Sequence, residues 1–130
     1  MSLENACFLS ATELAQGIRE QSFLAVELVE SVLARIEKQN PALNAYCTLM
    51  VDSALESARQ ADEQIAAGDP LGPLHGVPIS IKDNLYVKDS RTTFGSRLHE
   101  QDVTSADAPI TERLRQAGAI ILGRTNTPEF

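Results

Sequence analysis

The sequence GPLHGVPISIKDN, residues 72–84, marks the point where the character of this 130-residue chain changes. Upstream of Gly72, apolar residues recur at helical spacing, whereas here glycine and proline flank the short β-branched run Val77–Ile81. A short apolar run bounded by turn residues is typical of a buried strand. We therefore predict a strand at Val77–Ile81, with Lys82 directly at its end.

A second strand is predicted downstream at Ala119–Leu122, which reads AIIL. Between the two strands lie a loop of small residues and a helical pattern that Thr104 or Asp107 can cap and that Gly118 ends. Two strands joined through a helix are typical of a right-handed crossover between parallel strands. The second half of the chain is therefore predicted to be α/β.

The first half of the chain carries helical signals. Ser10 and Glu13 fit a capping box, in which each side chain meets the backbone amide of the other residue. Ser22 is placed to cap a longer amphipathic pattern, which Pro41 would end. The predicted elements are helices over residues 10–21, 22–40 and 53–68, with an extended stretch over 43–50.

Charge and hydropathy exclude several classes of function. The chain has 18 acidic and 11 basic residues, for a net charge of -7, and its first 69 residues carry eleven acids against four bases. An acidic chain without a basic stripe does not fit a phosphate backbone, so no nucleic-acid partner is expected. No window approaches the roughly 18 apolar residues of a membrane span, so no membrane association is expected either.

Cys7 and Cys47 are the two cysteines of the chain. Neither lies in a CxxC motif or at ligand spacing from a histidine, so we expect two free thiols and no metal site. Residues 1–10 carry no export signal, which predicts a cytoplasmic location. The glycines near Lys82 do not match a phosphate-binding loop, because that motif needs Ser or Thr after the lysine and Asp83 stands there. No cofactor is expected.

Lys82 is the residue whose position suggests chemistry. The apolar run before it would bring its amine into or to the edge of a buried sheet, where burial favours the neutral amine that a base requires. Taken alone, a lysine at a strand end is usually solvated or paired. Asp83 is a candidate partner, although neighbouring residues on a strand point to opposite faces. His75 and His99 have no acid or serine partner that the sequence identifies, so we interpret them as loop residues.

Three ordered blocks give the chain a family resemblance. GPLHGVPISIKDN, then RTTFGS at residues 91–96, then DAPITERLRQAGAIILGRTNTPEF over 107–130 resemble the N-terminal part of the amidase signature family of serine hydrolases. The resemblance is strong over residues 72–130 and weaker before them. It implies that residues 1–130 form the N-terminal portion of a single amidase-signature domain, with 1–70 mainly helical and 71–130 α/β. The implied fold is a mixed sheet flanked by helices.

The resemblance also implies a chemistry. The family hydrolyses amide bonds through a Ser, cis-Ser, Lys triad, and its lysine matches Lys82. By that mechanism, neutral Lys82 takes a proton from the bridging serine, which activates the nucleophilic serine. The implied function is hydrolysis of a carboxylic amide, with a small-molecule amide as substrate.

Both serines of the family triad lie downstream of the segment that matches residues 123–130, GRTNTPEF. The serines at positions 80, 90, 96 and 105 do not lie in that context, so we expect the 130-residue chain to be inactive by itself. The GRTNTPEF segment resembles stand-alone amidases more than the A subunit of glutamyl-tRNA amidotransferase, which stays an alternative, as does a non-catalytic interaction module. Two predicted strands make an incomplete sheet, so self-association through exposed apolar surface is also expected.

Overall fold

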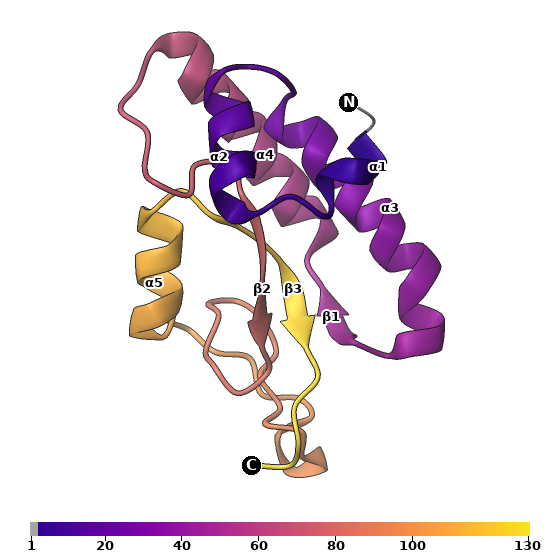
Figure 1. Cartoon of the computed structure of the whole chain (residues 1–130). Helices are drawn as coiled ribbons and strands as arrows, with labels where there is room; N and C mark the ends of the chain where they lie inside the picture. The colour runs from indigo at the N-terminus through magenta and orange to yellow at the C-terminus, as the bar shows by residue number, and fades with distance from the viewer. Residues whose placement is uncertain (1–2) are drawn as a thin grey trace.

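The computed structural model describes residues 3–130, with side chains from Asn5 onward. Figure 1 shows a sheet in the middle of the molecule, with helices α1 to α4 gathered on one side and α5 on the other. The loops that follow β2 and the C-terminal residues lie beyond the arrowheads of β2 and β3 (Figure 1). The predicted α/β class is confirmed.

The sheet has three strands in the order β1-β3-β2. β2 (Pro78–Lys82) runs parallel to β3 (Ile120–Thr125), and α5 (Pro109–Gln116) lies in the connection between them, as predicted. β1 (Tyr46–Leu49) pairs with the other side of β3 in the antiparallel direction, so the sheet is mixed. β3 begins one residue later than the predicted AIIL run, at Ile120, and extends beyond it through Thr125.

Three helices of the first half follow the predicted order with shifted ends, and a fourth, Leu3–Ala6, was not predicted. The capping box at the start of α2 is confirmed, because the Ser10 hydroxyl accepts from the Glu13 amide and Glu13 accepts from the Ser10 amide. Gly68 ends α4 in the left-handed conformation, also as predicted. The helices are α1 (Leu3–Ala6), α2 (Ala11–Arg19), α3 (Ala25–Leu43) and α4 (Val51–Ala67), and η1 (Arg97–His99) is a short 3-10 turn.

The predicted ends of α3 are wrong on both sides. Leu24, not Ser22, is the N-cap, and the Glu27 carboxylate accepts from its amide. Pro41 lies inside the last turn instead of ending the helix, which closes through left-handed Asn44. Asn40 then holds the turn into β1 by donating to the Tyr46 carbonyl and accepting from the Tyr46 amide.

The start of α5 also differs from the prediction. Ala108 is the N-cap, and Pro109 takes the first helical position, where its missing N–H costs no hydrogen bond. Asp107 instead accepts from the Lys88 amide and forms an ion pair with Arg115 at 2.8 Å. The carboxylate predicted to cap the helix therefore ties it to the loop after β2.

Two apolar clusters lie on opposite faces of the sheet. The larger joins α1 to α4 with Ile120 and Leu122 of β3, and small alanines of α4 let this helix pack closely. The smaller joins Ile81 and Ile121 with Val87, and Leu114 of α5 packs against it. Successive β3 residues point to opposite faces, so this strand is buried on both sides.

Candidate active site

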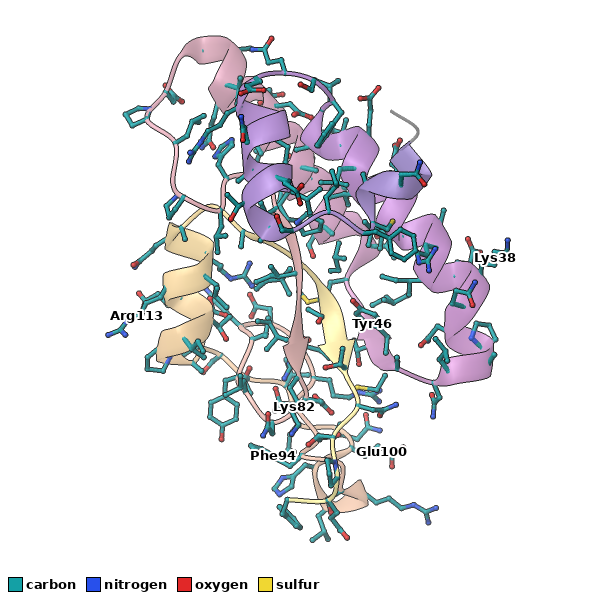
Figure 2. All side chains as sticks on the ribbon, viewed as in Figure 1. Lys38, Tyr46, Lys82, Phe94, Glu100 and Arg113 are labelled. Carbon is teal, nitrogen blue, oxygen red and sulfur yellow. The ribbon has the colours of Figure 1, made fainter. Side chains whose placement is uncertain are left out.

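Lys82 is the last residue of β2, at the carboxyl end of a strand that runs parallel to β3 (Figure 2). Of the two positions expected for this amine, within a buried sheet or at its edge, the structure shows the edge, because β2 is an edge strand and its side chains alternate. Ile81 is buried, whereas Lys82 is exposed. Its amine is therefore accessible to solvent at the end of the sheet where β2 and β3 terminate.

Asp83 does not pair with Lys82, contrary to one of the sequence interpretations. Its carboxylate is buried, and it forms an ion pair with Arg124 of β3, with Oδ1 and Nη2 3.4 Å apart. The same carboxylate accepts from the backbone amide of Thr93 at 3.3 Å and from the Thr93 hydroxyl. Adjacent residues point in opposite directions here, so Lys82 faces solvent while Asp83 faces the interior.

Arg124 is fully buried, with an exposed fraction of 0%. Its guanidinium forms hydrogen bonds with several residues of the loop that follows β2. Nη1 donates to the Arg91 carbonyl and to the Thr92 hydroxyl, each at 3.0 Å. Nη2 donates to the Lys82 carbonyl at 3.4 Å and to the Leu85 carbonyl. One side chain thereby joins both ends of the segment from residue 82 to residue 92.

Burial lowers the pKa of Arg124, and the neighbouring Asp83 carboxylate and Cys47 thiol oppose this shift. A guanidinium nevertheless stays protonated in a protein. Burial also raises the pKa of the Cys47 thiol, and the nearby Asp83 carboxylate adds to this effect. Cys47 donates to the Arg124 carbonyl at 3.5 Å, so this thiol serves the packing of β1 against β3 and is a poor nucleophile.

Backbone hydrogen bonds bring the three sequence blocks together. The Asp83 amide donates to the Thr125 carbonyl at 2.9 Å, and the Phe94 amide donates to the Asp83 carbonyl at 3.0 Å. The Phe130 amide in turn donates to the Phe94 carbonyl at 2.8 Å. The GPLHGVPISIKDN block, called the lysine block from here on, therefore lies beside the RTTFGS block and the GRTNTPEF block. All three meet at the end of the sheet where β2 and β3 terminate.

Gly95 lets two of these blocks approach closely. It has a φ of +68°, and a Cβ built there would lie 2.6 Å from the Thr127 carbonyl oxygen. Next to it, the Ser96 hydroxyl donates to Glu129 at 2.9 Å. A larger residue at position 95 would push the RTTFGS block away from the C-terminal segment.

The four serines named from the sequence have different surroundings. Ser80 is exposed on β2, and Ser105 is exposed in the loop before α5. Ser90 is buried, and its hydroxyl has no hydrogen-bond partner within the described part of the chain, whereas Ser96 bonds Glu129 as above.

The histidines have packing roles. His75 is buried, and its Nε2 lies 2.9 Å from the Ala61 carbonyl of α4. His99 pairs with Asp102 at 2.7 Å, and its ring forms edge contacts with Phe94 and Phe130. His75 lies outside the named helices and strands, in agreement with its interpretation as a loop residue, whereas His99 ends the 3-10 turn η1.

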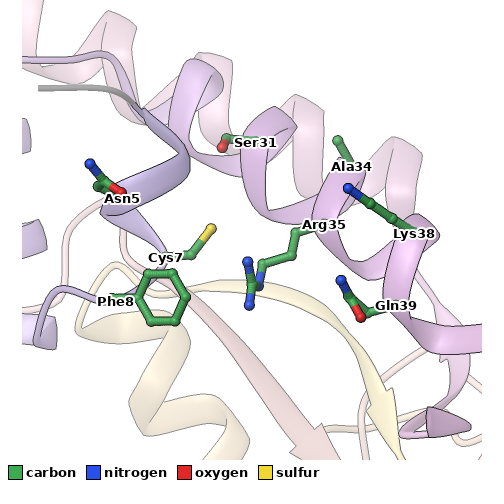
Figure 3. Close-up of a pocket in the computed structure, with 8 residues that line it drawn as sticks. All are labelled: Asn5, Cys7, Phe8, Ser31, Ala34, Arg35, Lys38 and Gln39. Atoms are coloured by element: carbon green, nitrogen blue, oxygen red, sulfur yellow. The ribbon is translucent and has the colours of Figure 1, made fainter. Parts of the chain in front are cut away.

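A hollow of about 420 Å³ lies between the N-terminal segment and α3 (Figure 3). Arg35 is part of its lining, and its guanidinium lies 4.7 Å from the centre of the Phe8 ring. The hollow contains no residue of the three sequence blocks. We therefore do not assign it to the candidate active site.

Among the described residues, no group of three His, Cys, Asp or Glu side chains could hold a metal ion, and both cysteines are free thiols. None of the helices within residues 3–130 is long and apolar enough to cross a membrane.

Sequence reasoning missed Arg124. A signal was available, because a lone arginine in the apolar run IILGRT must find a buried counter-charge. The sequence interpretation offers the acid after Lys82 to the lysine instead, which leaves the arginine without a partner.

Comparison with known proteins supports the resemblance. The sequence profile of the Amidase family matches residues 27–130. The A subunit of glutamyl-tRNA(Gln) amidotransferase from Carboxydothermus hydrogenoformans is 41% identical over 123 residues, 95% of this chain and 25% of that protein. An acylamidase from Rhodococcus erythropolis is 37% identical over 129 residues, 99% of this chain and 27% of that protein. The chain thus spans about a quarter of the length of these relatives.

Solved structures support the same resemblance. A fatty acid amide hydrolase superposes with a TM-score of 0.90 at 31% identity, covering 98% of this chain and 23% of that one. The native peptide amidase from Stenotrophomonas maltophilia superposes with a TM-score of 0.86 at 32% identity, covering 92% of this chain and 25% of that one. The fold, the three converging blocks and these matches lead to one conclusion: the chain belongs to the amidase signature family.

Proposed function

We propose that this sequence supplies the catalytic lysine, Lys82, of an enzyme that hydrolyses the C–N bond of carboxylic amides. The observation that carries the proposal is the position of Lys82, exposed at the carboxyl end of β2 where the three family blocks meet. Ligand sites in sheets with parallel strands form preferentially at such ends. Lys82 is also the residue that matches the lysine of the family triad.

In the proposed reaction, the neutral amine of Lys82 accepts the proton of a bridging serine hydroxyl. That serine in turn accepts the proton of the nucleophilic serine, whose oxygen forms a bond to the amide carbon. When the C–N bond breaks, the proton returns along the same path to the leaving nitrogen. Water then releases the acyl group from the serine, which regenerates the enzyme.

The test uses a complete amidase that carries this sequence. Lys82→Ala is expected to lower amide turnover by about 10²- to 10⁴-fold or more, the range of general base catalysis. Lys82→Arg is not expected to restore turnover, because a guanidinium stays protonated and cannot accept the proton. Lys88→Ala, at another exposed lysine in the following loop, is the matched control and should turn over normally. Near-normal turnover by either Lys82 variant would refute the proposal.

The 130-residue chain by itself is expected to be inactive. Its serines at positions 80, 90, 96 and 105 do not match the family's serine motif, so a nucleophile and its bridging serine would have to come from elsewhere. We expect no hydrolysis of simple aliphatic or aryl amides and no labelling by a serine-directed phosphonate. Labelling of one serine of this chain, abolished when that serine is replaced, would contradict this expectation.

A second candidate function is transfer of an amide nitrogen to glutamyl-tRNA(Gln). It is favoured by relatives named as the A subunit of that amidotransferase, which reach 48% identity over 80% of this chain, against 37% for the acylamidase. The two functions share the role of the lysine in breaking the C–N bond. They differ in what becomes of the released nitrogen, which the amidotransferase passes to glutamyl-tRNA(Gln). Hydrolysis of simple amides by the complete protein alone would support the amidase, whereas amide transfer that requires glutamyl-tRNA(Gln) would support the amidotransferase.

Three further expectations are proposals. The open edge of β2 and exposed Phe8 and Leu98 favour self-association of the isolated chain, which dye binding and light scattering would measure. If the chain were instead a non-catalytic interaction module, it would bind a specific partner, and Lys82→Ala would leave amide turnover unchanged.

A cytoplasmic location is consistent with the two free thiols.

A further inference from the structure

We propose that the buried Asp83–Arg124 pair is a positioning device for Lys82. The inference rests on the proposed function of Lys82 as a base. It assigns to two residues that do not touch the substrate the task of holding the backbone of the lysine in place.

The peptide unit between Lys82 and Asp83 is bonded to the end of β3 on both of its sides, and Arg124 of the pair makes one of the two bonds. The carbonyl of Lys82 accepts from Arg124 Nη2 at 3.4 Å, and the amide of Asp83 donates to the Thr125 carbonyl at 2.9 Å. Both partners belong to the end of β3. The peptide between Lys82 and Asp83 is thus bonded through its oxygen and its nitrogen to the neighbouring strand, which limits rotation about the backbone that carries the amine.

The side chain of Asp83 adds a third attachment. Its carboxylate bonds the amide and hydroxyl of Thr93 as well as Arg124, so it links the lysine block to the RTTFGS block. The exposed fractions of Asp83 and Arg124 are 2% and 0%, so bulk solvent does not reach these bonds. Loss of either charge would leave the other buried without a counter-ion and would loosen the side-chain attachments around Lys82, leaving the backbone bond to Thr125 as the remaining restraint.

Stability alone does not explain this arrangement. A buried ion pair is often no more stabilising than well-packed apolar residues of the same volume, because both ions lose their hydration. Its hydrogen bonds are directional, however, and a guanidinium fixes several acceptors in one plane. A base must hold its nitrogen within hydrogen-bond reach of the proton it accepts, and an error of about 1 Å can cost about 100-fold in rate.

The test compares an amide with a p-nitrophenyl ester of the same acyl group, in a complete amidase that carries this sequence. A leaving amine must receive a proton as its bond to carbon breaks, whereas p-nitrophenolate leaves without one. Misplacement of Lys82 should therefore reduce amide turnover more than ester turnover. A variant that only lowers the amount of folded enzyme would reduce both by the same factor, so the amide-to-ester ratio separates positioning from stability.

Asp83→Asn and Arg124→Gln are the single variants. We expect each to lower the amide-to-ester ratio by about 10- to 100-fold, as displacement of a reacting group does. Arg124→Lys keeps a charge that can reach Asp83, so its ratio should lie closer to the wild type than that of Arg124→Gln. The double variant Asp83→Asn/Arg124→Gln buries no unpaired charge, so it should fold even where a single variant does not, and its ratio should also fall.

Arg115→Gln is the matched control, because it breaks the Asp107–Arg115 pair at 2.8 Å on α5 without touching the peptide after Lys82. Its ratio should equal that of the wild type. A folded double variant with the wild-type ratio would overturn the inference, as would an equal fall in Arg115→Gln. Lys82→Ala separates the two levels: if it leaves amide turnover unchanged, the proposed function fails, and if it alone abolishes turnover, only the positioning role fails.

Discussion

The helical region before Gly68 and the loop region from Asp83 to Asp107 are held in place by different forces. In the helical region, fully buried Leu28, Val29 and the alanines of α4 pack against one another and against the sheet. In the loop region, buried groups are mainly polar, and several backbone carbonyls and the Thr92 hydroxyl bond the Arg124 guanidinium, which pairs with Asp83. Apolar attraction has no preferred direction, whereas hydrogen bonds and ion pairs specify the direction of their partners.

The two regions therefore contribute differently to the position of Lys82. The helices supply buried apolar area and hold β3, which is buried on both faces. The end of the same strand then carries Arg124, which fixes the loop after Lys82. The apolar half thus supports β3, and in the positioning role proposed above the polar half uses this support to place the lysine.

The largest effect on stability is expected from breaking the polar network. Arg124→Met leaves the Asp83 carboxylate buried and unpaired, which should destabilise the 130-residue chain by about 3–5 kcal/mol. Asp83→Asn/Arg124→Met removes both charges and should cost less than Arg124→Met alone. Urea unfolding followed by circular dichroism measures both values. If Arg124→Met costs no more than Arg115→Met at the more exposed ion pair, the contrast between the two regions is incorrect.

A comparable effect is expected in the apolar region. Leu28 has an exposed fraction of 0%, and Leu28→Ala should cost about 2–5 kcal/mol through lost burial and a residual cavity. The control is Leu24→Ala, at a leucine with an exposed fraction of 46%, which should cost much less. The same urea titration compares the two. Unlike the polar network, a shape-conserving Leu28→Met should restore most of the stability.

Gly123→Ala tests the junction between the two regions. A Cβ at this position would lie 2.3 Å from the Thr48 carbonyl oxygen of β1, so the strands would have to separate. We expect a loss of about 1–3 kcal/mol, as for an overpacked interior. Ser80→Ala, at an exposed position of β2, should change stability little. Normal stability of Gly123→Ala would mean that β1 can shift freely against β3.

The smallest effect is expected at the exposed start of α2. Ser10→Ala removes the cap and should cost about 1 kcal/mol near neutral pH. Hydrogen bonds from the Ser10 hydroxyl and amide hold the pKa of Glu13 below its usual value of 4.5. A lowered pKa in the folded state stabilises above the unfolded pKa, and this stabilisation is lost as the pH falls through the folded value. The stability difference between wild type and Ser10→Ala should therefore narrow below about pH 4.5, in urea titrations at several pH values.

Local patterns predicted much of the fold. The capping box at Ser10, the stop at Gly68 and the parallel pair formed by the two apolar runs depend on neighbouring residues, and all were confirmed. The helix ends predicted from Ser22 and Pro41 were wrong. The Glu27 carboxylate accepts from the Leu24 amide, which makes Leu24 the N-cap of α3, and the last turn of α3 ends at left-handed Asn44. Several residues near a helix end can satisfy the same rule, and the packing of the helix selects among them.

The sequence alone determined the class of fold, the order of most of its elements and the family, because these follow from periodicity and from short blocks of adjacent residues. Only the tertiary structure decided the partner of Asp83 and the exposure of Lys82. Arg124 contacts the Leu85 carbonyl 39 residues earlier in the chain, and β2 became an edge strand when β1 took the other side of β3. Such contacts depend on how strands are ordered in the sheet, which no local pattern of side chains encodes.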